Sequence, residues 1–134
     1  MAPARPACAP APASRTFIDI DARAVAAARS LVRSMGCGQR CAATIRSAEL
    51  VASELVANAI RHGAPPVILE ITCDGETVQV GVSDTSPDLP ALRQAGDDDE
   101  DGRGLRIVDV LSDSHGVDVL ESHKTVWARI AARF

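Results

Sequence analysis

The sequence predicts an α/β fold, a two-layer sandwich in which a mixed, mostly antiparallel sheet carries helices on one face. Short runs of alternating apolar and polar residues occur near both ends and in the middle of the chain, and they are typical of strands that bury one face. Between them, apolar residues recur at the three- and four-residue spacing of amphipathic helices. Strands and helices that each bury a single face favour two packed layers.

The first half of the chain predicts one strand and two helices. RTFIDID predicts a short strand, and Asp21 is expected to cap the following helix, ARAVAAARSLVRSM. Thr44 is expected to cap a second, long helix that ends at His62, with Gly63 as a left-handed stop. The predicted apolar faces of the two helices are Val25, Ala28, Leu31, Val32 and Met35, and Ile45, Ala48, Ala52, Leu55 and Ala59.

The second half predicts four strands and a short helix. VILEITC and TVQVGVSD alternate in phase, and the Asp-Gly pair at 74–75 between them is a hairpin signal. A long polar stretch over residues 85–103 precedes a short helix marked by Leu105, Val108 and Leu111. HGVDVLE and TVWARIAARF predict a final hairpin. We expect one domain over residues 15–134, preceded by a disordered Pro/Ala-rich tail over residues 1–14.

Composition argues against several functions. The chain has one Trp, two Phe and no Tyr, so it lacks the rings on which single-stranded nucleic acids stack. Its formal charge of −4 gives no basic surface for DNA or RNA. No segment has transmembrane length or the pattern of a secretory signal, so we expect a cytoplasmic protein. The cysteines at 8, 37, 41 and 73 lack paired zinc-ligand spacing and are interpreted as reduced thiols.

A column of polar side chains interrupts the second predicted helix. Glu54, Asn58 and His62 stand at i, i+4 and i+8, and Arg61 stands at i+7, which places them on one face. From the helix alone, a solvated polar stripe is the plainer interpretation. A carboxylate one turn before an amide also suits a magnesium-nucleotide site. The amide oxygen is a hard magnesium ligand, and the carboxylate can deprotonate a hydroxyl nucleophile.

Two other segments suit nucleotide binding. Asp84 ends a predicted strand in VSDTSPDLP, either as a turn residue or as a buried carboxylate that accepts a hydrogen bond from an exocyclic amine. In DGRGLRIVDVL a Gly-x-Gly runs into a helix whose first amides favour an anion. Because this Gly-x-Gly does not follow a strand, a dinucleotide-binding fold is disfavoured.

Taken together, SELVANAIRHG, VSDTSPDLP, GRGLRIV and KTVWARI resemble, in order and spacing, the GHKL ATP-binding superfamily of gyrase, heat-shock chaperones, histidine kinases and mismatch-repair ATPases. Within it, the chain is similar to the single-domain anti-sigma-factor serine/threonine kinases of bacteria. The resemblance covers about residues 15–134. It implies the Bergerat-type ATPase fold, with ATP and Mg²⁺ as cofactors.

The resemblance also implies roles for individual residues. Asn58 matches the magnesium ligand, Glu54 the proposed general base, and Asp84 the residue that recognises the adenine amine. His62 is expected to be structural, and Arg29 matches a partner-contacting Arg or is a solvated helix residue. Cofactor contacts are further implied for the second glycine box and the terminal segment, namely Gly102, Arg103, Gly104, Leu105 and Thr125.

The sequence departs from the family pattern in two places. The first glycine box has no glycine in Asp84-Thr-Ser-Pro-Asp88, which implies a stiffer loop. The acidic run over residues 97–101 falls in the segment that closes over the γ-phosphate in relatives, where negative charge repels phosphate. Magnesium binding is therefore better supported than catalysis.

The resemblance implies a regulatory kinase that binds a sigma factor and phosphorylates a STAS-type anti-anti-sigma partner. The alternative is a nucleotide-dependent, non-catalytic partner-binding module. A histidine-kinase remnant is disfavoured, because no upstream helix with a phospho-accepting His is expected. No direct nucleic-acid partner and no membrane are expected, and homodimerisation is expected by resemblance alone.

Overall fold

The computed structural model of the chain describes residues 11–34, 42–74, 77–87 and 100–131. Its elements follow the predicted order. They are β1 (Ala11–Ile18), α1 (Ala24–Ser34), α2 (Ala42–His62), β2 (Val67–Cys73), β3 (Thr77–Asp84), α3 (Glu100–Leu111), β4 (Ser114–Val119) and β5 (Lys124–Ala131).

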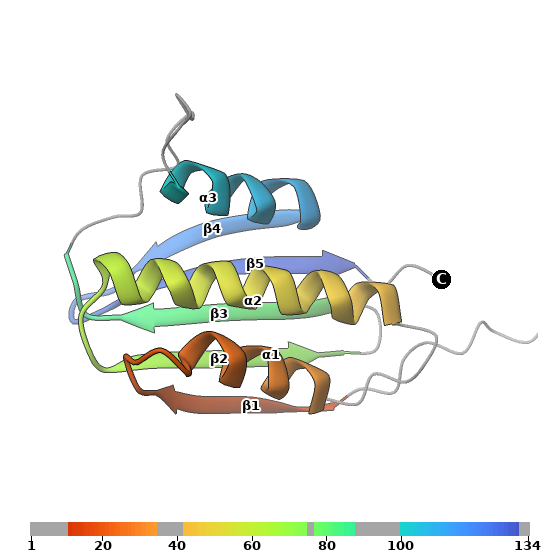
Figure 1. Cartoon of the computed structure of the whole chain (residues 1–134), viewed down its shortest axis with the longest axis horizontal. Coiled ribbons are helices and arrows are strands. Elements are labelled where there is room, and N and C mark those ends of the chain that lie inside the picture. Colours follow the sequence, from red (N-terminus) through yellow and green to blue (C-terminus); the bar gives the residue numbers. More distant parts are fainter. Residues whose placement is uncertain (1–10, 35–41, 75–76, 88–99, 132–134) are drawn as a thin grey trace, which may run out of the picture.

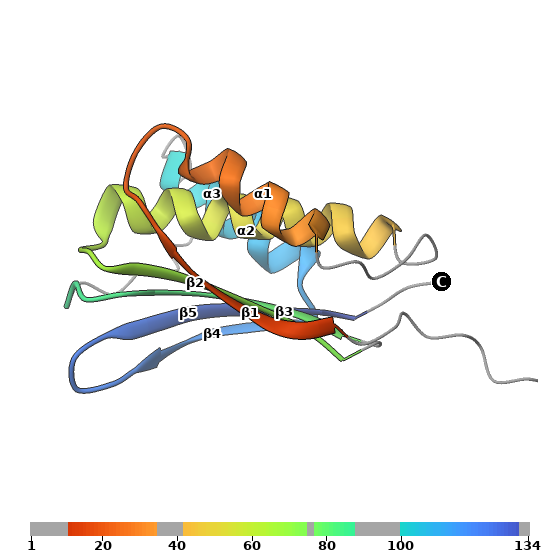
Figure 2. The same ribbon diagram turned by 90° about the horizontal axis from the view of Figure 1, so that it is seen from below.

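The described strands form a five-stranded sheet in the order β1-β2-β3-β5-β4. Every pair is antiparallel, so the described sheet contains no parallel pair of the kind that a mixed sheet would include. All three helices of the described residues lie on one face of the sheet, and no described element covers the other face (Figures 1 and 2). The predicted two-layer α/β fold is confirmed.

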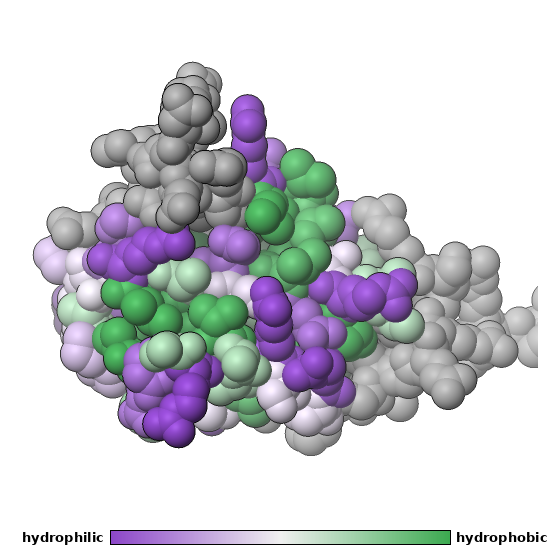
Figure 3. All heavy atoms as spheres, viewed as in Figure 1, coloured by the Kyte–Doolittle hydropathy of each residue, from purple (hydrophilic) through white to green (hydrophobic). Residues whose placement is uncertain are grey.

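The core lies between the two layers. Alternate residues of each central strand face the helices, and the predicted inward sets Val67, Leu69, Ile71, Cys73 and Val78, Val80, Val82 are all buried. On α2, four of the five predicted apolar positions are buried, and Ile45 packs against the core from its edge. Some apolar surface is still exposed on the helix layer, as the space-filling view shows (Figure 3).

The helices start close to their predicted positions. The Asp21 carboxylate accepts a hydrogen bond from the backbone N of Arg23 at 2.7 Å, so Asp21 caps the start of α1 as predicted. The cap predicted for α2 is wrong, because the helix already begins at Ala42 and Thr44 is buried in its first turn. Met35 lies outside the described residues.

The N-terminal boundary and one cysteine differ from expectation. β1 starts at Ala11, inside the segment expected to be a tail, because pairing with β2 places Ala11 opposite Cys73. Pro12 is tolerated there because β1 is an edge strand. Cys73 is disulfide-bonded, which corrects the expectation of a reduced thiol at this position. The expectation rested on the spacing of cysteines along the sequence. That spacing does not reveal which segments strand pairing places beside Cys73.

No helix in the described part of the chain combines the length and apolar character needed to cross a membrane.

Candidate functional site

Asp84 is the buried carboxylate at the end of β3. It lies in phase with Val78, Val80 and Val82, on the side of the sheet that the helices cover, and its relative exposure is 3%. Its Oδ1 atom accepts hydrogen bonds from the backbone N of Ser86 at 2.8 Å and of Ala64 at 3.3 Å. Asp84 is therefore buried and holds the turn after β3, and its recognition of a purine amine stays a prediction.

The segment that follows α2 is held against Asp84. Thr85 donates its backbone N–H to the carbonyl of Ala64 at 3.0 Å and its hydroxyl to the carbonyl of Pro65 at 2.8 Å. Gly63 does not adopt the left-handed conformation predicted for it. Instead, a Cβ at this position would clash with the carbonyl oxygen of Ala59 and would also lie 2.8 Å from Cγ of Asp84, so glycine is needed because both groups approach closely.

Lys124 is a site residue that the sequence reasoning missed. Its Nζ donates to Oδ1 of Asp84 at 3.0 Å and to the carbonyl of Ser86 at 2.9 Å, and it is 4% exposed. The two side chains are direct cross-strand neighbours of β3 and β5. The signal was present in the sequence, because Lys124 has the same phase as the inward-facing Val126 and Ala128.

Glu54 and Asn58 lie on the side of α2 that faces away from α1. The α1 side is marked by Ser53 and Glu49, which contact arginines of α1. Because an α-helix turns by about 100° per residue, Glu54 and Asn58 lie on the opposite flank of α2 from Ser53 and Glu49. This flank is on the side of α2 where α3 packs. Both are half-buried, and no hydrogen bond or ion pair involves either side chain within the described residues. His62 is exposed at the end of the helix.

The second glycine box lies inside α3 rather than before it. The helix begins at Glu100, so Gly102, Arg103 and Gly104 belong to its first turns, whose leading amides have no intrahelical partner. This end of α3 lies above the C-terminal half of α2, at the same end of the molecule as the end of β3 (Figure 1). The side chains of Arg103 and Leu105 lie outside the described residues.

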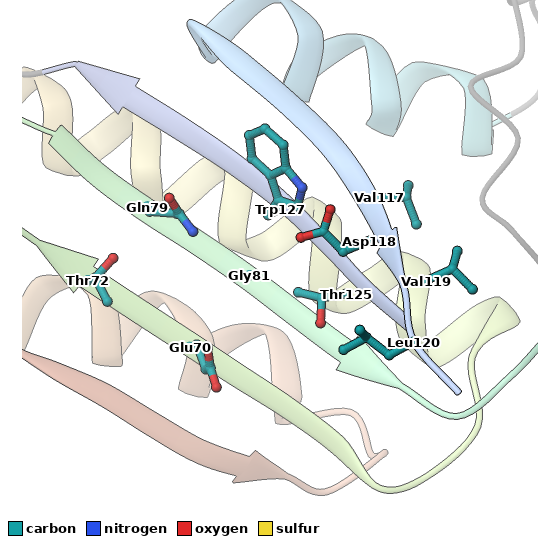
Figure 4. Close-up of a pocket in the computed structure, with 10 residues that line it drawn as sticks. All are labelled: Glu70, Thr72, Gln79, Gly81, Val117, Asp118, Val119, Leu120, Thr125 and Trp127. Atoms are coloured by element: carbon teal, nitrogen blue, oxygen red, sulfur yellow. The ribbon is translucent and has the colours of Figure 1, made fainter. Parts of the chain in front are cut away.

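Thr125 is not brought together with Asp84. It lies on the uncovered face of the sheet, where its hydroxyl is 2.7 Å from that of Ser83. There it helps to line a groove of about 580 Å³ together with Trp127 and Gly81 (Figure 4). Thr125 directly follows Lys124 on β5, and successive strand residues face opposite sides of a sheet. The side chain of Thr125 therefore points away from Asp84.

Arg29 links α1 to α2. Its Nε donates to the Ser53 hydroxyl at 2.6 Å, and that hydroxyl donates to the Glu49 carbonyl at 2.7 Å. The Arg29 side chain, expected to contact a partner or solvent, therefore also joins the two helices next to Glu54.

Asp84 thus lies buried at the end of β3, and Asn58 and Glu54 lie half-buried on one flank of α2. A model of the histidine kinase-like ATPase domain matches residues 18–130, which is most of the sequence. The chain belongs to the histidine kinase-like ATPase domain family. The resemblance drawn from the sequence is thereby confirmed at the level of the family.

Two solved structures show the ATPase-domain fold. One contains the RsbU and RsbW domains of Rv1364c from Mycobacterium tuberculosis, with a TM-score of 0.63, 16% identity, and coverage of 89% of this chain and 31% of that one. The other is the histidine kinase domain of the blue-light activated histidine kinase EL346 from Erythrobacter litoralis, with a TM-score of 0.53, 18% identity, and coverage of 81% and 59%. This chain thus spans less than two thirds of either protein. No curated protein matches it.

The magnesium that this ATPase family implies fits the residues present. The Asn58 amide is a hard oxygen ligand, it is partly accessible, and no described partner uses it. The described residues contain no group of three His, Cys, Asp or Glu side chains that would form a complete cage. A single protein oxygen is how Mg²⁺ is commonly held when nucleotide phosphates supply the other ligands.

Proposed function

We propose that this ATPase-family domain binds ATP with Mg²⁺ between α2, the start of α3 and the sheet, and acts as an anti-sigma-factor-like serine/threonine kinase. The observation that carries the proposal is the arrangement of Asp84, Asn58 and Glu54. Asp84 lies on the helix-covered side of the sheet, and the other two lie on the flank of α2 that faces α3. The base would lie near Asp84 and the phosphates near Asn58.

The chain's residues would divide the work as follows. Asn58 contributes an oxygen to Mg²⁺, which supplies positive charge to the phosphates. Glu54 takes the proton of a partner's serine or threonine hydroxyl. The hydroxyl oxygen forms a bond to the γ-phosphorus, the bond from that phosphorus to the β–γ bridging oxygen breaks, and ADP leaves. The leading amides of α3 would hold phosphate oxygens.

The proposed partners are a sigma factor, which the domain would hold, and a STAS-type anti-anti-sigma protein, which it would phosphorylate. Support comes from the sequence resemblance to anti-sigma kinases and from the fold shared with an RsbW domain. Arg29 stands on α1 as a candidate contact to the partner, although its Nε is already bonded to Ser53.

A second candidate is a nucleotide-dependent module that binds the partner without phosphorylating it. One observation favours it. The acidic run over residues 97–101, of which residues 97–99 lie outside the described part of the chain, puts five carboxylates in the segment that closes over the γ-phosphate in relatives, where phosphoryl transfer needs positive charge.

Phosphate transfer separates the two candidates. The assay incubates the wild-type domain and Glu54→Gln with radiolabelled ATP and a STAS protein that the domain demonstrably binds. A kinase labels the partner, and Glu54→Gln lowers the rate by roughly 10²–10⁴-fold, the usual contribution of a general base. A matched control is Glu70→Gln, the same change on the uncovered face. If the domain binds the STAS partner but transfers no radiolabelled phosphate to it, the kinase proposal is wrong and the non-catalytic binding module remains.

A further inference from the structure

Lys124 is the only lysine in the chain, and it is inside the molecule. A buried ammonium needs a counter-charge and hydrogen-bond acceptors, because desolvation strongly disfavours an isolated charge. Lys124 finds both at the end of β3, in the carboxylate of Asp84 at 3.0 Å and the carbonyl of Ser86 at 2.9 Å. The register of β3 and β5 fixes this arrangement, since the two residues are directly paired.

The ion pair uses up much of the acceptor capacity of Asp84. Oδ1 receives three donors, the amides of Ala64 and Ser86 and the ammonium of Lys124. A carboxylate oxygen has only two lone pairs, so Oδ1 is saturated. Oδ2 lies beside Gly63, where a Cβ would be 3.0 Å away. A purine amine could therefore donate only to Oδ2. The negative charge of the carboxylate is already compensated by the ammonium of Lys124.

We propose that Lys124 sets the base specificity of this site, by occupying Asp84 so that the site is almost indifferent to the 6-amino group of a purine. The inference rests on the proposed function, namely that a nucleotide binds here. A neutral amine gains more from a free carboxylate than from one that an ammonium already neutralises. Removing the ammonium should therefore create selectivity for the amine.

The test compares ATP with purine riboside triphosphate, which is ATP without its 6-amino group. Calorimetry with Mg²⁺ gives the ratio of the two affinities. We expect a ratio within about 3-fold for the wild type, and a preference for ATP of roughly 10-fold or more for Lys124→Met, the difference expected for a hydrogen bond to a charged acceptor. Met keeps the length of the side chain, and Asp84 keeps its two backbone donors.

Arg129→Met is the matched control. It removes one positive charge from the same strand, at an exposed position, so it changes net charge equally without touching Asp84. Its affinity ratio should equal that of the wild type. Equal selectivity for the amine in wild type and Lys124→Met would overturn the role of Lys124 and leave nucleotide binding intact. No binding of either nucleotide by any of the three proteins would overturn the proposed function, and this inference with it.

A second measurement needs no substitution. Because the chain has one lysine, protein made with ¹³C-lysine gives a single ε-methylene signal in an NMR spectrum. If Lys124 stays on Asp84 when nucleotide binds, ATP and purine riboside triphosphate shift this signal equally. A large shift with ATP alone would mean that the amine displaces the ammonium, and the proposal would be wrong.

Discussion

Asp84→Asn tests whether the buried ion pair stabilises the fold. Asparagine keeps the shape of the side chain and an oxygen that can accept from the amides of Ala64 and Ser86. What it removes is the negative charge, which leaves the ammonium of Lys124, only 4% exposed, without a counter-ion. The substitution therefore isolates charge compensation from packing.

The size of the effect follows from these contacts. Removing one partner of a buried ion pair costs about 3–5 kcal/mol. We expect the lower end, about 3 kcal/mol, because the Ser86 carbonyl and the new amide oxygen still accept hydrogen bonds from Lys124. The melting temperature should fall by about 10 °C for a domain of this size. Adding Lys124→Met to Asp84→Asn removes the stranded charge and should restore about 2 kcal/mol.

Urea denaturation followed by circular dichroism measures all four corners of this double-mutant cycle. The control is Arg15→Met, which breaks the ion pair of Arg15 with Glu70, 3.4 Å apart with side chains 67% and 48% exposed. Exposed pairs contribute about 0–1 kcal/mol, so this variant should unfold almost like the wild type. Two outcomes would refute the reasoning. One is a free energy of unfolding for Asp84→Asn within about 1 kcal/mol of the wild type, which is the limit for an exposed pair. The other is a double variant whose loss of stability equals the sum of the losses in the two single variants.

Three further predictions concern α2 and its end. Asn58→Ala should leave the melting temperature nearly unchanged and reduce the magnesium-dependent part of the ATP affinity measured by calorimetry, because water replaces the amide ligand imperfectly. Glu54→Gln should keep ATP affinity while phosphate transfer to a STAS partner falls by roughly 10²–10⁴-fold. Gly63→Ala should lower the free energy of unfolding by about 1–3 kcal/mol and weaken ATP binding, because its Cβ would clash with the Ala59 carbonyl and push on the fixed carboxylate of Asp84.

Each of these has a contrary outcome. Equal ATP affinity with and without Mg²⁺ in the wild type would remove Asn58 from the metal site. Equal transfer rates for wild type and Glu54→Gln would remove the general base. Gly81→Ala is the control for Gly63→Ala, because its Cβ would meet a Thr125 methyl at 3.3 Å rather than a hydrogen-bonded carboxylate. If both alanine variants are equally stable, the close approach at Gly63 has no energetic cost.

The order of elements and their inward faces could be predicted because they are local properties. The alternation of Val67, Leu69 and Ile71 specifies a strand with one covered face, and each lies in the core as expected. The same holds for Ala48 and Leu55 on α2, whose spacing alone defines the buried stripe. Asp84 could be placed because it continues the alternation of its own strand.

The arrangement around Asp84 could not be predicted, because it depends on pairs that lie far apart in the chain. Lys124 lies 40 positions from Asp84, and only the register of β3 and β5 brings them together. The final strand, predicted from Thr125, starts one residue earlier in the structure, and that residue is Lys124. The role of Gly63 was assigned to backbone conformation, whereas the structure shows two close neighbours that leave no room for a side chain, the nearby Ala59 carbonyl and the carboxylate of Asp84, which is distant in the sequence.

The strand order has a consequence for how the domain opens. β3 is the middle strand, bonded to β2 on one side and to β5 on the other, while β1 and β4 are the outer strands of the described sheet. Outer strands detach at lower free energy than inner ones, so local openings of native proteins begin there. Amide protons of β3 should be among the slowest to exchange with deuterated solvent. Detachment of β1 or β4 breaks no hydrogen bond between β3 and β5, the two strands that hold Asp84 and Lys124 together, so we expect fraying at the margins of the sheet to leave the proposed nucleotide site in place.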